Sequence, residues 1–214
     1  MIKRLLLPLS LLVFVPLLAL AEDTAPDYIE GTHYDLITPA VRTANPDKIG
    51  VSEFFWYGCG HCYTFEPMVE QWKKSLPDDV DFRGSPAIWN AAMELHARAY
   101  YTADVLNVLD TMHAVLFQAM NVDRKRLSSE GEVAALFTAN GVAAEDFTKA
   151  FSSFGVSSQV RQANARARAA KISGTPALMV NGKYHISTRK AGSQADMLKV
   201  AEFLLEKERA AKGS

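Results

Sequence analysis

The chain contains two cysteines, Cys59 and Cys62, with two residues between them. They follow residues 49–57, a nearly continuous apolar and aromatic run that predicts a buried strand, and they precede a segment with helical spacing. Cys59 is therefore expected at the start of a helix, where free N–H groups and the helix dipole favour a thiolate. Cys62 lies nearly one turn further on, close enough for a disulfide. We predict a redox-active pair in which Cys59 exchanges with a client and Cys62 resolves the mixed disulfide.

The residue types around this pair favour redox chemistry over its alternatives. His61, between the two cysteines, adds a positive or hydrogen-bonding group near the same sulfur. A stabilised thiolate favours the reduced form and makes the disulfide more oxidising. An inert structural disulfide and one half of a metal site are the alternatives, but the other histidines show no paired ligand spacing and are expected on the surface or in the core. They are His33, His96, His113 and His185.

Composition and the first residues indicate where the protein works. The chain has 214 residues with 23 basic and 24 acidic side chains, a balance that argues against nucleic-acid binding. Residues 1–21 combine Lys3 and Arg4 with an apolar run and a small-residue cleavage pattern, as in a secretory signal peptide. An uncleaved membrane anchor is the alternative, but the apolar run is short and interrupted by prolines. We expect cleavage after Ala21 and export of residues 22–214 to an oxidising compartment.

The pattern outside the cysteine pair predicts strands in both end regions of the chain. Short runs rich in β-branched and aromatic residues mark five strands, at residues 34–37, 49–57, 80–83, 177–180 and 183–187. Asn181-Gly182 between the last two is a strong signal for a hairpin. Helical spacing follows Cys62 to about residue 75, and Ser193 opens a last helix.

The middle of the chain is expected to be helical. From about residue 88 to 172 the apolar residues follow helical spacing. Ser129 opens one helix, a second covers about 144–154 and ends at Gly155, and a third runs over about 157–172. The order is therefore strand, cysteine pair, helix, strand, a long helical block, hairpin and helix, which is an α/β pattern.

Two segments resemble the signature motifs of one family. EFFWYGCGHCYTFEP, residues 53–67, is similar to the active-site segment of the thioredoxin superfamily, specifically the DsbA family of periplasmic thiol:disulfide oxidoreductases. SGTPALMVNGKY, residues 173–184, resembles the second signature of that family, a cis-proline loop with its hairpin. The resemblance implies an α/β thioredoxin fold with a large inserted all-helical domain. Residues 22–87 and 173–214 would form the two parts of the thioredoxin fold, and residues 88–172 the insertion.

The resemblance implies roles for residues at both motifs. Cys59 matches the nucleophile and Cys62 its buried partner, with His61 between them. Pro176 matches the cis-proline that faces the pair. Thr175 precedes this proline, and its backbone is expected to pair with an extended client peptide like an added strand.

Three further residues are candidates near the pair. Glu53 matches a buried acid that assists proton transfer, and a glutamate in an apolar strand is costly unless it is paired or functional. A strand-edge glutamate facing water is the alternative. Glu66 matches a second acidic position or is a plain surface charge. Trp56 belongs to an aromatic run that is mostly core, but it is close enough to the pair to contact a client.

The resemblance also implies an activity and partners. We expect a dithiol oxidase that introduces disulfides into reduced exported proteins in the periplasm. It would act as a monomer without metal or cofactor and be reoxidised by a quinone-linked membrane oxidase of the DsbB type. A strongly acidic cysteine thiol and an oxidising disulfide are known properties of DsbA, and the resemblance, not the cysteine spacing, implies them for this chain. A chaperone-like binding module with a vestigial cysteine pair is the alternative class, with Met93 and Met112 on its surface; such residues are more often core.

Two positions depart from the best-known DsbA oxidases. Gly60 stands where those proteins have proline, and Gly-His is the dipeptide of eukaryotic protein disulfide isomerase. Thr175 stands where they have valine, as in thioredoxin-like isomerases. Both positions belong to elements that tune the redox potential. A less oxidising homologue that acts as an isomerase or reductase is therefore the alternative within this family.

Overall fold

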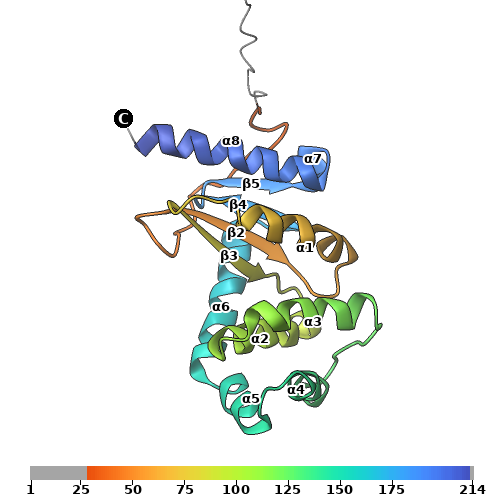
Figure 1. Ribbon diagram of the computed structural model, residues 1–214. Coiled ribbons are helices and arrows are strands. Elements are labelled where there is room, and N and C mark those ends of the chain that lie inside the picture. Colours follow the sequence, from red (N-terminus) through yellow and green to blue (C-terminus); the bar gives the residue numbers. More distant parts are fainter. Residues whose placement is uncertain (1–27, 213–214) are drawn as a thin grey trace, which may run out of the picture.

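A computed structural model describes residues 28–212 of the chain (Figure 1). The expected signal peptide and its cleavage site after Ala21 lie outside the described residues. No helix among the described residues is long and apolar enough to cross a membrane. The elements in chain order are β1 (Asp35–Leu36), β2 (Ile49–Phe55), α1 (Gly60–Lys73), β3 (Val80–Pro86), α2 (Ala91–Val105), α3 (Leu109–Asn121), α4 (Glu130–Ala139), α5 (Ala144–Phe151), α6 (Phe154–Ala169), β4 (Ala177–Val180), β5 (Tyr184–Ser187), α7 (Thr188–Ala191) and α8 (Gln194–Lys212).

The strands form one mixed sheet in the order β1-β5-β4-β2-β3. β2 is parallel to β3 and antiparallel to β4, so it joins strands from the two end regions of the chain. β4 and β5 form the predicted hairpin, and both turn residues, Asn181 and Gly182, have positive φ. Because β2 ends shortly before Cys59, this sheet determines where the cysteine pair lies.

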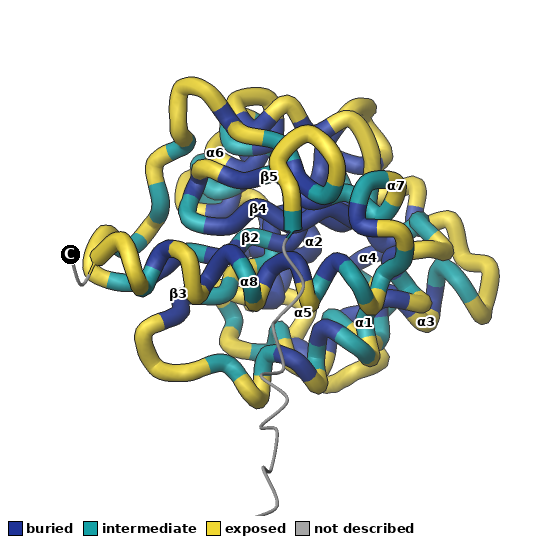
Figure 2. The backbone as a smooth tube through the Cα atoms, turned by 90° about the horizontal axis from the view of Figure 1, so that it is seen from above, coloured by how far each residue is buried: buried dark blue, intermediate teal, exposed yellow. Residues whose placement is uncertain are grey.

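Helices cover both faces of the sheet. α1 and α8 pack on one face, where Val51 of β2 and Val180 of β4 belong to the same core cluster (Figure 1). On the other face, Phe54 and Met179 pack against the end of α6. Figure 2 shows that residues along β2 and β4 are buried between these helices. Successive side chains of a strand alternate between faces, so Glu53, two residues after Val51, points to the side of α1.

Helices α2 to α6 enclose a second core beyond β3 (Figure 1). Phe55 and Tyr57, at the end of β2, belong to this core. The Tyr57 ring lies edge-on to Phe117 of α3, with centroids 4.9 Å apart. Met93 and Met112, candidates for a chaperone-like surface, are 2% and 1% exposed and belong to the core instead. The helical block therefore attaches to the sheet through residues that directly precede the cysteine pair.

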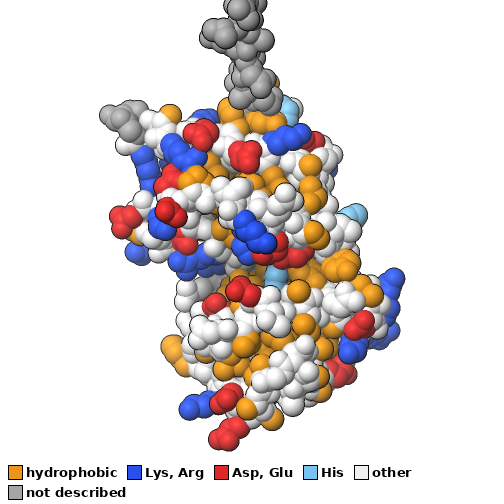
Figure 3. Space-filling view, in the orientation of Figure 1, with side chains coloured by type: hydrophobic (Ala, Val, Ile, Leu, Met, Phe, Trp, Pro, Cys, Tyr) orange, Lys and Arg blue, Asp and Glu red, His pale blue; other side chains and the backbone are white. Residues whose placement is uncertain are grey.

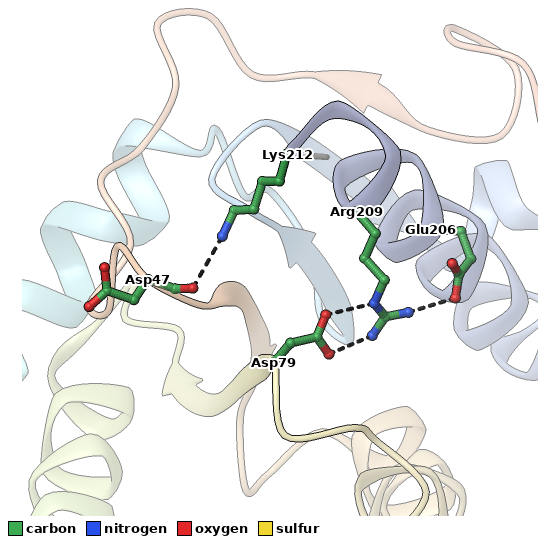
Figure 4. Close-up of polar contacts among 5 residues, drawn as sticks. All are labelled: Asp47, Asp79, Glu206, Arg209 and Lys212. Atoms are coloured by element: carbon green, nitrogen blue, oxygen red, sulfur yellow. Dashed lines mark hydrogen bonds and ion pairs between the residues drawn. The ribbon is translucent and has the colours of Figure 1, made fainter. Parts of the chain in front are cut away.

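Charged contacts stabilise the end of the sheet that lies away from the cysteine pair (Figure 4). Arg209 of α8 donates two hydrogen bonds to the Asp79 carboxylate, at 2.7 and 2.8 Å, and a third to Glu206 at 2.6 Å. Lys212 Nζ donates to the Asp47 carbonyl at 3.3 Å. The two aspartates precede β3 and β2, whereas the cysteine pair follows the other end of β2. Elsewhere on the face seen in Figure 3, acidic and basic side chains are interspersed.

The helix boundaries in the middle of the chain differ from the prediction. The helix expected over about 144–154 ends early, at Phe151, and the next helix begins at Phe154. Ser153 caps the new helix, since its Oγ accepts a hydrogen bond from the amide three residues further on, at 3.2 Å. Gly155, expected to end a helix, lies in the first turn of the next one. The apolar spacing continues across the break, and only the capping serine marks it.

Smaller differences concern the strands and one short helix. β3 extends to Pro86 rather than to residue 83, because its parallel register with β2 continues to Phe55. β1 spans only Asp35–Leu36, and the four-residue helix α7 was not predicted.

Candidate active site

Cys59 is the N-cap residue of α1. Its Sγ accepts a hydrogen bond from the Cys62 amide at 3.3 Å, so the sulfur takes the place of a capping oxygen. Both cysteines are free thiols; Cys59 is half-buried and Cys62 is fully buried. Of the two sulfurs, that of Cys59 is therefore the one open to an attacking thiol. Among residues 28–212, no group of three or more His, Cys, Asp or Glu side chains is placed to hold a metal ion.

The surroundings lower the pKa of the Cys59 thiol to about 5. The largest cause is a hydrogen bond from the Cys62 side chain, and burial opposes the shift. Hydrogen bonds from the Thr175 side chain and from the amides of Cys62 and His61 further favour the thiolate. Burial raises the pKa of the Cys62 thiol well above its ordinary value. At neutral pH the reduced pair thus carries one thiolate, on Cys59, and one thiol.

The loop between α6 and β4 lies against the cysteine pair. The Thr175–Pro176 peptide bond is cis, as the family resemblance implies. Cys59 Sγ lies 3.5 Å from the Thr175 carbonyl oxygen. Pro176 is buried and Thr175 is half-buried. A chain segment bound at the Thr175 backbone would therefore lie beside the reacting sulfur.

The backbone of His61 holds the turn that contains the cysteines. Its amide is one of the donors to the Cys59 sulfur, and its side chain is exposed. Its carbonyl oxygen accepts hydrogen bonds from Gln194 Nε2 at 2.6 Å and from Thr64 Oγ1 at 3.0 Å. Since Gln194 begins α8, this contact ties the last helix to the cysteine turn.

Trp56 lies over Gly58 and turns towards α2. A β-carbon on Gly58 would lie 2.4 Å from the Trp56 ring, so this close approach requires glycine. Trp56 Nε1 donates to His96 Nδ1 at 2.9 Å, and the two rings stack with centroids 6.2 Å apart. His96 also contacts the Leu127 carbonyl oxygen at 3.0 Å. Trp56 thus connects the end of β2 to the helical block, and the residue is half-buried.

A buried acidic cluster lies between β2, α1 and α3. Glu53 is 2% exposed, and its Oε1 has no hydrogen-bond partner among the described residues. Glu66 lies one helical turn after Cys62, on the same face of α1. Glu66 Oε1 lies 3.1 Å from His113 Nε2, and its Oε2 is also buried without a partner in the described chain. Glu53, Glu66 and His113 line a cavity of about 200 Å³.

The electrostatics of this cluster favour a protonated Glu53. Burial, followed by the neighbouring Glu66 carboxylate, raises the pKa of Glu53 well above its ordinary value, and Lys73 opposes the shift. A carboxyl group kept neutral in this way can release and regain a proton. Its burial excludes a strand-edge glutamate facing water. The Glu66 side chain, 13% exposed, is not a plain surface charge either.

His113 and Tyr57 are candidate functional residues that the sequence did not single out. His113 Nδ1 lies 2.7 Å from the Tyr57 hydroxyl, while its Nε2 contacts Glu66. Asn121 Nδ2, at the end of α3, donates to the Tyr57 carbonyl at 2.8 Å. A lone histidine in a helix carries no spacing signal, and His113 was expected only on the surface or in the core. The packing of α3 against the end of β2 brings these groups together.

The fold and this site define the class of protein. A thioredoxin fold with a helical insertion, carrying a low-pKa cysteine at a helix N-terminus beside a cis-proline loop, is that of a thiol:disulfide oxidoreductase. The chain belongs to the family of the DSBA-like thioredoxin domain, whose model matches residues 79–201. The fold class and the enzyme class expected from the sequence are confirmed.

Named relatives match over most of the chain. It is 39% identical over 192 residues to the thiol:disulfide interchange protein DsbA of Azotobacter vinelandii, covering 89% of this chain and 90% of the relative. It is 37% identical over 187 residues to DsbA of Pseudomonas aeruginosa, covering 87% and 89%. The crystal structure of Pseudomonas aeruginosa DsbA superimposes with a TM-score of 0.84 at 36% identity, covering 87% of this chain and 97% of that chain. Alignments of this length include the cysteine pair.

Proposed function

We propose that this enzyme introduces disulfides into reduced proteins exported to the periplasm. The observation that carries the proposal is the Cys59 thiol, whose pKa is lowered to about 5 at the N-terminus of α1 beside the Thr175 carbonyl. A thiolate that is stable at neutral pH favours the reduced form of the pair. The oxidised form therefore passes its disulfide on readily.

The exchange takes two steps, with Cys59 as the reacting sulfur. A client thiolate attacks Cys59 Sγ of the oxidised pair and forms a mixed disulfide, and Cys62 leaves and takes up a proton. A second client thiolate attacks the client sulfur of that bond, and Cys59 leaves as a thiolate. The client loses two electrons and gains one disulfide, while the enzyme pair gains the electrons. A leaving thiol of low pKa speeds the second step.

The residues around the sulfur bind and position the client. The Thr175 backbone pairs with an extended client segment like an added strand, and buried Pro176 keeps that backbone beside Cys59. The His61 amide favours the thiolate. Half-buried Trp56 contacts the client.

The acidic cluster exchanges the proton of Cys62. Cys62 must gain a proton when it is displaced and lose it when the pair is reoxidised. Glu66 lies one turn away on α1, and the neutral Glu53 shares its cavity. His113 is a positioning residue, because it holds Glu66 Oε1 from the side of α3.

The cellular setting follows from the same proposal. Cleavage after Ala21 leaves residues 22–214, which act as a monomer in the periplasm without a cofactor. A quinone-linked membrane oxidase of the DsbB type reoxidises the pair. Residues 22–87 and 173–214 form the thioredoxin fold, and residues 88–172 form the inserted helical domain.

The alternative is an isomerase or reductase of lower potential, motivated by Gly60 and Thr175. The contacts of Thr175 argue against it, because its side chain is among the donors that lower the pKa of Cys59. A donor that stabilises the thiolate raises the potential instead. Gly60 is the first residue of α1, a position where proline is well tolerated, so Gly60→Pro tests its contribution directly.

The deciding experiment is an equilibrium of the mature protein with glutathione, combined with oxidation of a reduced, unfolded client that has two cysteines. We expect a potential near about −120 mV, the family's reference value for DsbA, and catalysed oxidation. Cys59→Ser and Cys62→Ser should each abolish catalysis, because neither variant can form the disulfide that is passed to the client. A potential near about −180 mV, as in protein disulfide isomerase, with faster reshuffling than oxidation would favour the alternative.

A further inference from the structure

A groove of about 590 Å³ begins at Thr175 and Pro176. Its other walls are β1, the junction of β5 with α7, and the residues that follow α6. The exposed side chain of Leu36 and the buried Ile37 supply apolar surface within it. Apart from the cis-proline loop itself, no residue of this groove has a role in the exchange described above.

The groove carries two cations that have no carboxylate partner. Lys171 and Arg189 come from two different walls, both are exposed, and neither forms an ion pair within residues 28–212. Asp35 also lines the groove, but Lys190 already pairs with it. Half-buried His185 faces the same space, and burial lowers its pKa, so at neutral pH it is uncharged and offers no partner to either cation. The unpaired charge in the groove is therefore positive.

The end of α6 opposes this charge only partly. The helix dipole places about half a negative charge at a helix C-terminus. Arg166 and Arg168, in the last turn of α6, counter it in turn. Two full positive charges exceed this contribution, so the groove favours an anionic occupant.

The groove also reaches Thr175, the residue whose carbonyl oxygen lies beside the reacting sulfur. Cys59 Sγ lies 3.5 Å from the Thr175 carbonyl oxygen, and Thr175 lines the groove. An extended peptide rises about 3.3 Å per residue. In the mixed disulfide the client cysteine is joined to Cys59, and the client backbone pairs with Thr175. The client residues next to that cysteine therefore enter the groove.

We propose that this groove binds an acidic flank of the client, with aspartate or glutamate within a few residues of the reacting cysteine and on one side of it. Lys171 and Arg189 pair with the client carboxylates, and Leu36 contacts the aliphatic parts of the same segment. The proposal rests on the proposed function, since it requires a client at Thr175. The proposal defines a class of preferred clients, namely reduced proteins in which aspartate or glutamate lies close to the reacting cysteine.

The test compares dithiol peptides that differ only in the charge beside the first cysteine. One series carries aspartate or glutamate, a second the corresponding amides and a third lysine, on either the N-terminal or the C-terminal side. Exposed ion pairs each change binding by roughly two- to fivefold. We expect kcat/KM at low salt to be about five- to tenfold higher for the acidic peptide than for the amide peptide. This preference should appear when the acid lies on one side of the cysteine and be absent when it lies on the other. Added salt should reduce this ratio towards one.

The variant that tests the groove is Lys171→Glu with Arg189→Glu. It should reverse the preference, so that the lysine peptide is oxidised faster than the acidic one. The matched control, Lys74→Glu with Lys149→Glu, makes the same change of charge at two exposed lysines outside the groove and should keep the acidic preference. All three proteins should oxidise the amide peptide at the same rate, because none of these side chains belongs to the cysteine site.

Three results would overturn the proposal. The first is a groove variant that keeps the acidic preference. The second is equal kcat/KM of the intact enzyme for acidic and amide peptides. The third is a control variant that loses the preference as fully as the groove variant. Failure to oxidise even the amide peptide would instead contradict the proposed function, and the binding proposal with it.

Discussion

His113 Nε2 lies 3.1 Å from Glu66 Oε1, so a histidine of α3 pairs with an acid one turn from Cys62 on α1. The two helices lie far apart in the sequence, and α3 belongs to the helical block. The same histidine reaches the Tyr57 hydroxyl at 2.7 Å. The helical block therefore supplies a polar group to the acidic cluster near the cysteine pair, in addition to covering it.

Replacing His113 with leucine should destabilise the protein, because Glu66 would lose its partner in a largely buried position. A buried group left without its hydrogen bond costs about 1–3 kcal/mol. Urea unfolding of His113→Leu, Glu66→Gln and the double variant should give a coupling energy of at least about 0.5 kcal/mol. The pH profile of client oxidation should also shift in His113→Leu. Additive energies with an unchanged profile would contradict the pairing.

The pH dependence of Cys59 provides a second prediction. Alkylation of the reduced protein should report a thiolate with a midpoint at about pH 5. Cys62→Ala should move the midpoint upwards, because it removes the largest cause of the shift. A midpoint near 8.5, the ordinary value for a thiol, would refute the assigned geometry.

The same pKa determines how stability and potential respond to pH. The folded pKa of Cys59 lies well below the ordinary value of a thiol, so its contribution to the stability of the reduced form is fully present above that ordinary value and is lost as pH falls through about 5. The oxidised form lacks this contribution. Above pH 5 the reduced pair binds one proton, on Cys62, and the potential should fall by about 30 mV per pH unit; below pH 5 it binds two, and the slope should double to about 59 mV. Redox titrations at several pH values measure both slopes.

Thr175→Val tests the direction in which this threonine acts. Valine has a similar shape but lacks the hydroxyl that favours the Cys59 thiolate. We expect a higher Cys59 pKa and a potential lower by about 30 mV, the equivalent of about 1.4 kcal/mol. Thr175→Ser keeps a hydroxyl and is the control that should stay close to the parent protein. A rise in potential on Thr175→Val would support the isomerase-like reading of this position instead.

Glu53→Gln tests the buried acid. The folded pKa of Glu53 is raised, so its contribution to stability is present at low pH and is lost as pH rises through that value. The glutamine variant should therefore be more stable than the parent at alkaline pH, by at least about 1 kcal/mol, and should oxidise clients more slowly. Glu70→Gln, on an acid of α1 that is 44% exposed, should do neither. Equal alkaline stability of Glu53→Gln and the parent protein would contradict a buried, neutral Glu53.

Local patterns predicted most elements of this fold. The hairpin at Asn181-Gly182 and the capped helix after Ser193 are where the sequence placed them, because turn and cap preferences act within a few residues. A break between α5 and α6 was also predicted, but at Gly155, a few residues after its true position between Phe151 and Phe154. The apolar spacing continues across it, and a single capping serine, Ser153, outweighs that pattern.

The sequence by itself determined the reacting pair. The spacing of Cys59 and Cys62 after an apolar strand places one sulfur at a helix end and the other one turn on, and this arrangement depends on adjacent residues alone. Tertiary structure decided which groups surround the pair. Thr175 lies beside Cys59, and His113 beside Glu66, because sheet order and helix packing bring distant segments together. No periodicity along the chain records such contacts, since they depend on how whole elements pack.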